Sequence, residues 1–247
     1  ALDSDIANIT LADLSKFEGK KEFNITKYEG RNYEMVMFNY DNEYLDDVNF
    51  RKAIISAIDR EKLLKEAYVG NVNLSNFPLN TSSKYYNSNI KEIAYDKDES
   101  LKYLLSGLKS VNQSMEDKKQ AEENKANSEE LQGIVEDNST SSKTTSEFTK
   151  KEIKEILNKI ELKIVVSENN SERIKVAQTI REDLDRIGIK TVINELNNKD
   201  LDKALNSKDY DLAIVGYSLP SIPDARDILK ACHIKDEKLS TYITSLG

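Results

Sequence analysis

The sequence predicts an α/β fold in which a mixed β-sheet is flanked by helices. Two observations support this prediction. Apolar segments at residues 162–166 and 189–193 enclose a helix pattern at residues 171–187, and a strand, a helical crossover and a second strand form a right-handed parallel βαβ unit. Residues 35–38 (Met-Val-Met-Phe) form an unbroken apolar run, which is typical of a strand covered on both faces.

Two strands and two helices are expected between residues 23 and 70. Residues 23–29 and 34–39 have strand patterns, and residues 30–32 between them favour a turn. An amphipathic helix follows, because apolar residues recur three and four positions apart on one helical face: Phe50, Ala53, Ile54, Ala57 and Ile58. Asp46 and Asp47 precede this helix, where carboxylates can accept from free backbone N–H groups. Asp59 is expected to cap a second short helix that ends near Gly70.

The middle of the chain is expected to be a loop, a helix and an insertion. Residues 71–95 contain Pro78 and clusters of Asn and Ser, which predict a long surface loop. Asp96 and Glu99 resemble a capping box that opens a helix with an apolar stripe to residue 108. Residues 109–148 are polar; residues 115–134 among them are rich in helix formers, and the remainder is typical of a flexible linker.

The last part of the chain contains the βαβ unit and one further strand. A capping box at Thr149 and Glu152 predicts a helix before the unit. Ser171 is a candidate cap for the helix inside the unit, and Gly188 stands where a left-handed residue would end that helix. A short helix at residues 201–205 then leads to a strand at residues 212–217.

Four of these segments resemble the family 5 extracellular solute-binding proteins, which are the dipeptide, oligopeptide and nickel receptors of ABC importers. The first is residues 39–61, with Asn39 at a strand end, an acidic turn and then Arg51, Ala53 and Asp59-Arg60. The second is the Tyr95-Asp96 helix start that leads to Gly107. The third is the βαβ unit, with Ala177, Ile180, Leu184 and Ile187-Gly188-Ile189. The fourth is Tyr210-Asp211, an apolar strand, Gly216, and Tyr217 where the family has Trp.

The resemblance implies a fold and a function. Residues 1–247 correspond to the second, C-terminal lobe of a two-lobe fold of the periplasmic-binding-protein type (type II), with residues 109–148 as a lineage-specific insertion. Such a lobe would capture a small solute, an oligopeptide or a related molecule, between two lobes that close about a hinge. The closed receptor would deliver the solute to an ABC permease in the membrane. The parent protein is expected to be monomeric, extracellular and tethered as a lipoprotein.

The resemblance also implies a ligand cleft at the end of the last strand. Tyr217, Ser218, Leu219 and Asp224 are the candidate ligand-binding residues there, with Asn39 and Tyr40 at the end of the neighbouring strand. Three of them have a specific structural alternative: Tyr217 as a core residue, Asp224 as the cap of a helix at residues 225–231, and Asn39 as the residue that closes a turn.

The acidic residue that often holds a ligand ammonium in peptide-binding members of the family is not found where it is expected. Leu219, Pro220 and Ser221 occupy the matching positions, and the first carboxylate is Asp224. The sequence therefore leaves three alternatives open: a different ligand, a displaced anchor, or a receptor that has lost binding.

Composition argues against several other classes of function. The net charge of −8 argues against nucleic-acid binding. The chain has one cysteine, Cys232, and one histidine, His233; adjacent side chains point in different directions, so we expect no metal site and no cofactor. No Gly-x-Ser-x-Gly elbow or Gly-rich phosphate loop is present. We therefore expect no enzyme; paired carboxylates at Asp46 and Asp47 would be the alternative, but helix capping explains them.

A second function remains open from the sequence. The lobe could be degenerate as a receptor and act as a protein-interaction module at the cell surface. The missing ammonium anchor favours this hypothesis, and the insertion at residues 109–148 would then be part of the contacting surface.

Overall fold

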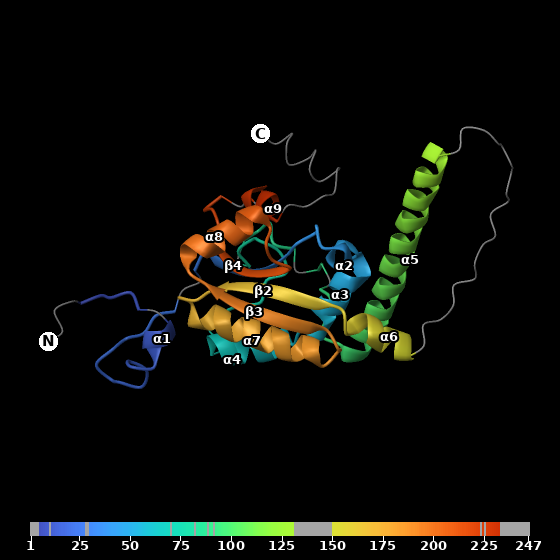
Figure 1. Cartoon of the computed structure of the whole chain (residues 1–247). Coiled ribbons are helices and arrows are strands. Elements are labelled where there is room, and N and C mark those ends of the chain that lie inside the picture. The colour runs from blue at the N-terminus through green and yellow to red at the C-terminus, as the bar shows by residue number, and fades with distance from the viewer. Residues whose placement is uncertain are drawn as a thin grey trace.

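The computed structural model describes residues 5–9, 11–27, 30–69, 71–81, 83–87, 89–90, 92–130, 150–222, 224 and 226–232. A four-stranded mixed sheet forms the centre of the described structure (Figure 1). Its strands are β1 (Asn32–Phe38), β2 (Glu161–Ser167), β3 (Lys190–Leu196) and β4 (Leu212–Ser218), in the spatial order β1-β4-β2-β3. Strands β4, β2 and β3 are parallel, and β1 is antiparallel to β4. The predicted mixed α/β sheet is confirmed.

Helices cover both faces of this sheet. Figure 1 shows α7 (Ser171–Asp185) and α4 (Arg60–Tyr68) below the sheet, and α8 (Asn198–Ser207) and α9 (Arg226–Ala231) above it. Side chains alternate between faces along a strand. Leu212 and Ile214 of β4 therefore join one apolar cluster, whereas Ala213 and Val215 join the other.

The larger cluster contains most of the helix-to-helix packing. Phe50 and Ile54 of α3 (Val48–Ala57) pack there with Leu104 and Leu108 of α5 (Lys97–Glu130), and all four are essentially inaccessible to solvent. The remaining helices are α1 (Leu11–Leu14), α2 (Glu43–Asp46) and α6 (Lys150–Leu157).

Several predicted helix ends are confirmed by their hydrogen bonds. The Asp47 carboxylate accepts from the backbone N–H groups of Asn49 (2.8 Å) and Phe50 (2.9 Å), which caps α3. Asp59 caps α4 by accepting from the N–H of Lys62 at 3.0 Å. Gly188 has φ of 90°, the left-handed conformation expected after α7.

Three details of the sequence prediction are wrong. Residues 23–27 form no strand, because the Phe23 ring packs edge-on against Phe17 instead of joining the sheet (5.1 Å between centroids). Asn170, and not Ser171, caps α7, through a 2.8 Å hydrogen bond from the Arg173 N–H. The expectation that the helix after Asp59 ends near Gly70 is confirmed: α4 ends at Tyr68, and Val69 after it is left-handed, with φ of 52°.

The third difference is that α5 continues through Gly107 to Glu130 as one unbroken helix, which takes in residues 115–130 of the stretch that is rich in helix formers. Gly107 is a packing position within this helix: a Cβ there would lie 2.7 Å from the backbone nitrogen of Phe50. Figure 1 shows α5 projecting away from the sheet beyond its contact with α3. The boundary of the 109–148 insertion stays a prediction, and residues 131–149, with Thr149 of the expected capping box, lie outside the described residues.

Candidate ligand-binding site

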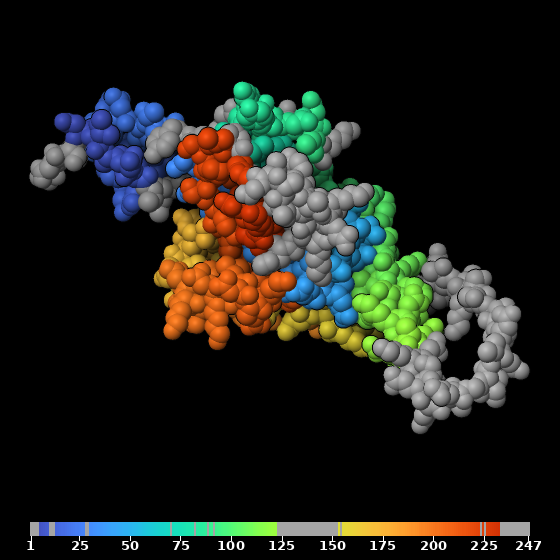
Figure 2. All heavy atoms as spheres, turned by 90° about the horizontal axis from the view of Figure 1, so that it is seen from above, coloured from blue at the N-terminus to red at the C-terminus, as the bar shows by residue number. Residues whose placement is uncertain are grey.

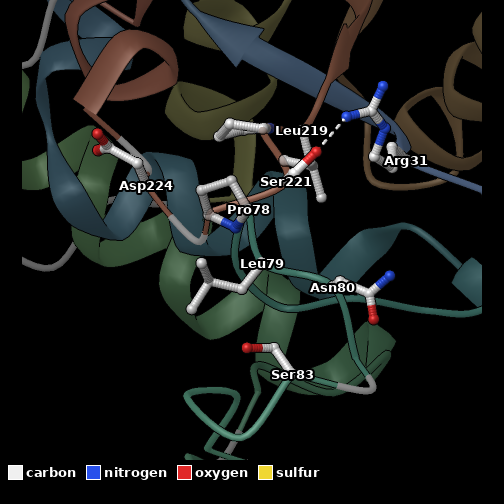
Figure 3. Close-up of a pocket in the computed structure, with 9 residues that line it drawn as sticks. Arg31, Pro78, Leu79, Asn80, Ser83, Leu219, Ser221 and Asp224 are labelled. Carbon is white, nitrogen blue, oxygen red and sulfur yellow. Dashed lines mark hydrogen bonds between the residues drawn. The ribbon is translucent and has the colours of Figure 1, made fainter.

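A hollow of about 280 Å³ lies at one edge of the sheet (Figure 3). Its walls come from three segments that are far apart in the sequence. They contribute Arg31, Pro78, Leu79, Asn80, Ser83, Leu219, Pro220, Ser221 and Asp224. Parallel strands end at a common edge, here Ser167, Leu196 and Ser218, and open α/β sheets bind ligands in the crevice outside those carboxyl ends. The hollow is therefore the best candidate for a ligand site.

The first wall is the segment that leaves β4. The Leu219 N–H donates to the Arg31 carbonyl at 2.7 Å, which extends the pairing of β1 and β4 by one residue. The Leu219 side chain is buried, and Ser218 before it is exposed. Nη1 of Arg31 donates to Oγ of Ser221 at 2.8 Å, so the guanidinium lies along the segment (Figure 3).

The second wall is part of the long loop between α4 and α5. Oγ of Ser75 donates to the Phe77 carbonyl at 2.8 Å, and the rings of Phe77 and Tyr86 stack with centroids 4.3 Å apart. The Ser83 N–H donates to the Asn80 carbonyl at 2.9 Å. These contacts shape the backbone that carries Pro78 and Leu79. Figure 2 shows this loop beside the segment after β4 on the molecular surface.

Two predicted site residues, Leu219 and Asp224, line the hollow. Asp224 also has the capping role that was its structural alternative. Leu219 lines the hollow directly. Asp224 lines it while accepting from the Arg226 N–H (2.9 Å) and from Nε of Arg226 (2.8 Å). Asp224 thus caps the start of α9, and its hydrogen bonds with Arg226 hold the pKa of its carboxyl below the usual range.

Tyr217 and Ser218 lie next to the hollow but do not line it. Tyr217 packs in the smaller apolar cluster with Cys232, and its hydroxyl points to Sδ of Met37 at 3.8 Å. Burial raises the pKa of the Tyr217 hydroxyl. In this structure Tyr217 therefore has the surroundings of a core residue, which was its structural alternative.

The expectation that Asn39 and Tyr40 lie beside the end of β4 is wrong. Because β1 is antiparallel to β4, Phe38 pairs with Leu212 at the start of β4, whereas Asn32 pairs with Ser218. Asn39 is buried at the opposite edge of the sheet, where its Nδ2 donates to the carbonyls of Lys208 (3.0 Å) and Tyr210 (2.8 Å). It closes a turn.

A second hollow, of about 390 Å³, lies at that opposite edge. Residues 41–44 and 159–162 line it. The amino ends of the parallel strands meet there, and this edge is not the usual ligand edge of an open α/β sheet. The hollow at the end of β4 is therefore the better candidate for the ligand site.

An ion pair crosses β4 close to the first hollow. Nε and Nη2 of Arg173 donate to the two carboxylate oxygens of Glu34 at 2.6 and 3.0 Å. The pair lies over Gly216, where a Cβ would come within 2.1 Å of Nη2 of Arg173. Burial, together with the Glu34 carboxylate, raises the pKa of nearby Tyr68 to about 12. This bidentate contact ties the start of α7 to β1.

Among the described residues, no group of three or more His, Cys, Asp or Glu is arranged to hold a metal ion. His233, considered above with Cys232, lies outside them. No helix in the part of the chain that the structure describes has the length and apolar character needed to cross a membrane.

Sequence reasoning missed most of the hollow. Arg31 and Ser83 were not expected to meet the end of β4, because they are more than a hundred residues away from it in the chain. One sequence feature could have indicated the second wall. The stretch Phe77-Pro78-Leu79 resembles a Pro-containing loop of the family 5 solute-binding proteins.

Comparison with known proteins identifies the family of this chain. A family model described as bacterial extracellular solute-binding proteins, family 5 Middle, matches residues 3–232. Heme-binding protein A of Haemophilus influenzae is 26% identical over 94 residues, which are 38% of this chain and 17% of that protein.

Solved structures share the fold. The substrate-binding protein CtaP of an ABC transporter of Listeria monocytogenes has a TM-score of 0.70 at 17% identity, over 96% of this chain and 41% of that chain. The oligopeptide-binding protein AppA of Bacillus subtilis, in complex with a nonapeptide, has a TM-score of 0.66 at 18% identity, over 96% and 43%. The chain thus spans about two fifths of the length of these solved relatives. With a family match over nearly its whole length, this chain belongs to the family 5 bacterial extracellular solute-binding proteins.

Proposed function

We propose that this chain is one lobe of a two-lobe receptor that captures an oligopeptide or a related small solute for import by an ABC transporter. The hollow at the end of β4 is the observation that supports this function most directly. It lies at the edge where open α/β sheets bind ligands, and its walls are loops held on a rigid sheet. The solved relatives are more than twice as long as this chain, which is consistent with a second lobe that completes the site.

In this proposal the solute lies between two lobes that close about a hinge. Pro78, Leu79 and Leu219 offer apolar surface, and the polar groups of Asn80, Ser83 and Ser221 orient the solute. Leu219 and Asp224 are proposed contacts because they line the hollow, and Tyr217 and Ser218 because they adjoin it. The opposite position of Asn39 and Tyr40 gives no support for a role of these two residues in the same site. The receptor works as a monomer with a membrane permease, tethered by an N-terminal lipid.

The proposal is tested by adding candidate ligands to the receptor and by blocking the hollow with a larger side chain. We expect the full-length receptor to be stabilised thermally by at least one of three probes: a tripeptide library, the nickel(II)–histidine complex or hemin. A ligand at a hundred times its Kd stabilises the folded state by about 2.7 kcal/mol. Ser221→Trp should weaken binding of the same probe at least about tenfold, because the new side chain occupies the space of the solute.

The matched control is Ser207→Trp, which places the same side chain on an exposed position at the end of α8. This variant should bind the probe as the parent does. Equal affinity in both variants would place the ligand elsewhere. No shift with any probe would favour the alternative function, a protein-interaction module.

A further inference from the structure

The two charged side chains at the hollow differ in how far their charge is available to a solute. Two ionised side chains line it, Arg31 and Asp224. The Asp224 carboxylate is already bound to Arg226 through Nε at 2.8 Å and through Nη2 at 2.6 Å, and it accepts from the Arg226 backbone as well. These bonds offset the negative charge that would attract an ammonium group. The Asp224 side therefore offers a neutral ion pair and not a free negative charge.

Arg31 is in the opposite situation. Its side chain is exposed, and within the described residues its one hydrogen bond is the 2.8 Å contact of Nη1 with Ser221 Oγ. A guanidinium has five N–H donors, so most of them remain for a ligand. Within the same part of the chain, Arg31 makes no salt bridge to a carboxylate. Figure 3 shows Arg31 and Asp224 on opposite sides of Leu219 and Ser221.

Arg31 is also held in place. Its carbonyl accepts from the Leu219 N–H at 2.7 Å, so its backbone is fixed to the end of β4, and Ser221 orients its guanidinium. A cation that is positioned by two contacts and lacks a counter-ion is suited to bind a planar anion in two parallel hydrogen bonds. The neighbouring wall of Pro78 and Leu79 suits the uncharged part of such a solute.

We propose that this receptor selects solutes that present a carboxylate, and that Arg31 binds this carboxylate at the hollow. The inference rests on the proposed function and specifies the chemistry of its ligand. Peptides with a free C-terminus, nickel–histidine complexes and heme with its propionates all carry the required group. Arg31 thus takes the place of the ammonium anchor as the charged residue that determines specificity on this lobe.

The experiment compares each probe with its neutral derivative on the full-length receptor by calorimetry. The pairs are tripeptides and their C-terminal amides, nickel–histidine and nickel–histidinamide, and hemin and its dimethyl ester. For the pair that binds, we expect the acid to bind at least about tenfold more tightly than the neutral derivative, because a charge-assisted bidentate contact is lost. Arg31→Ala should remove most of this preference, and Arg31→Lys should restore it only in part.

The control is Arg181→Ala, which removes the same charge from an exposed position on α7 and should keep the preference. If acid and neutral forms bind equally, or if Arg31→Ala keeps the preference, the carboxylate inference is wrong while solute capture stands. If neither member of any pair binds, solute capture itself is wrong, and the carboxylate inference is wrong with it. The two failures are therefore distinguishable.

Discussion

At the scale of single residues, Gly216 shows how one missing side chain positions an ion pair. The carboxylate of Glu34 and the guanidinium of Arg173 meet across β4 directly above this glycine. Both side chains are at most about one third exposed, so the pair is shielded more than an ordinary surface salt bridge. The sequence marked Gly216 as part of a family pattern, but the reason for a glycine became visible only with the pair in place.

We predict that Gly216→Ala lowers the free energy of unfolding by about 1–2 kcal/mol, because the new methyl group forces the bidentate contact apart. Chemical denaturation measures this change. In an Arg173→Ala background the same substitution should cost less than about 0.5 kcal/mol, since the contact is already absent. An undiminished cost in that background would show that the methyl group disturbs something other than the pair.

At the scale of elements, the contact between α3 and α5 organises the larger apolar cluster. Gly107 lets the two helices approach so closely that a Cβ would lie 3.0 Å from Cα of Phe50 and 3.0 Å from the Asp47 carboxylate. The neighbouring atoms are mostly backbone, which cannot rotate away. The same short approach explains why a glycine stands in the middle of a long helix, where it is otherwise unfavourable by about 1 kcal/mol relative to alanine.

Gly107→Ala is therefore expected to destabilise the protein by about 1–3 kcal/mol, because overpacking outweighs the gain in helix propensity. Gly30→Ala is the control: beyond the adjacent residues of the chain, the new Cβ would meet the backbone nitrogen of Asn32 only at 4.0 Å, and its effect should stay within about 0.5 kcal/mol. Urea unfolding of both variants gives the comparison. A Gly107→Ala protein as stable as its parent would mean that α3 and α5 can separate without cost.

At the scale of the whole molecule, the sheet with its covering helices forms one body from which α5 projects (Figure 1). Among residues 97–122 of α5, Val111 is the last one that is buried, Met115 is half-buried, and residues 116–122 are exposed. Residues 116–122 thus add little to the core. This agrees with a polar insertion that the fold tolerates.

Replacing residues 116–148 by a Gly-Ser linker of about ten residues should leave the unfolding free energy within about 0.5 kcal/mol of the parent, since surface changes away from packing contacts rarely cost more. Solute affinity should also stay the same, because the hollow is built from other segments. Denaturation and calorimetry check the two expectations. A loss of solute affinity would give the insertion a part in capture, and a large loss of stability would show that it packs on the fold.

Much of the fold and little of the site could be predicted. Helix stripes and caps such as Asp47 and Asp59 depend on spacings within a single helix, and the βαβ unit lies within residues 161–196, so all of them can be recognised locally. The strand expected at residues 23–29 failed over its described part because a strand needs a partner, and patterns do not show whether one is present. Asn39 was placed at the wrong edge because the direction of β1 is decided by its pairing with β4, whose residues stand 174 (Phe38 and Leu212) to 186 (Asn32 and Ser218) positions later in the chain.

The sequence by itself determined the fold class, the family and several helix ends, because local propensities and periodic apolar positions act over a few turns of chain. Only the tertiary structure decided which loops meet. The direction of β1 places Arg31 at the end of β4. The path of the loop between α4 and α5 places residues 78–83 in the wall of the same hollow. These contacts depend on the packing of segments that are distant in the chain. A local sequence pattern does not show which distant segments pack together.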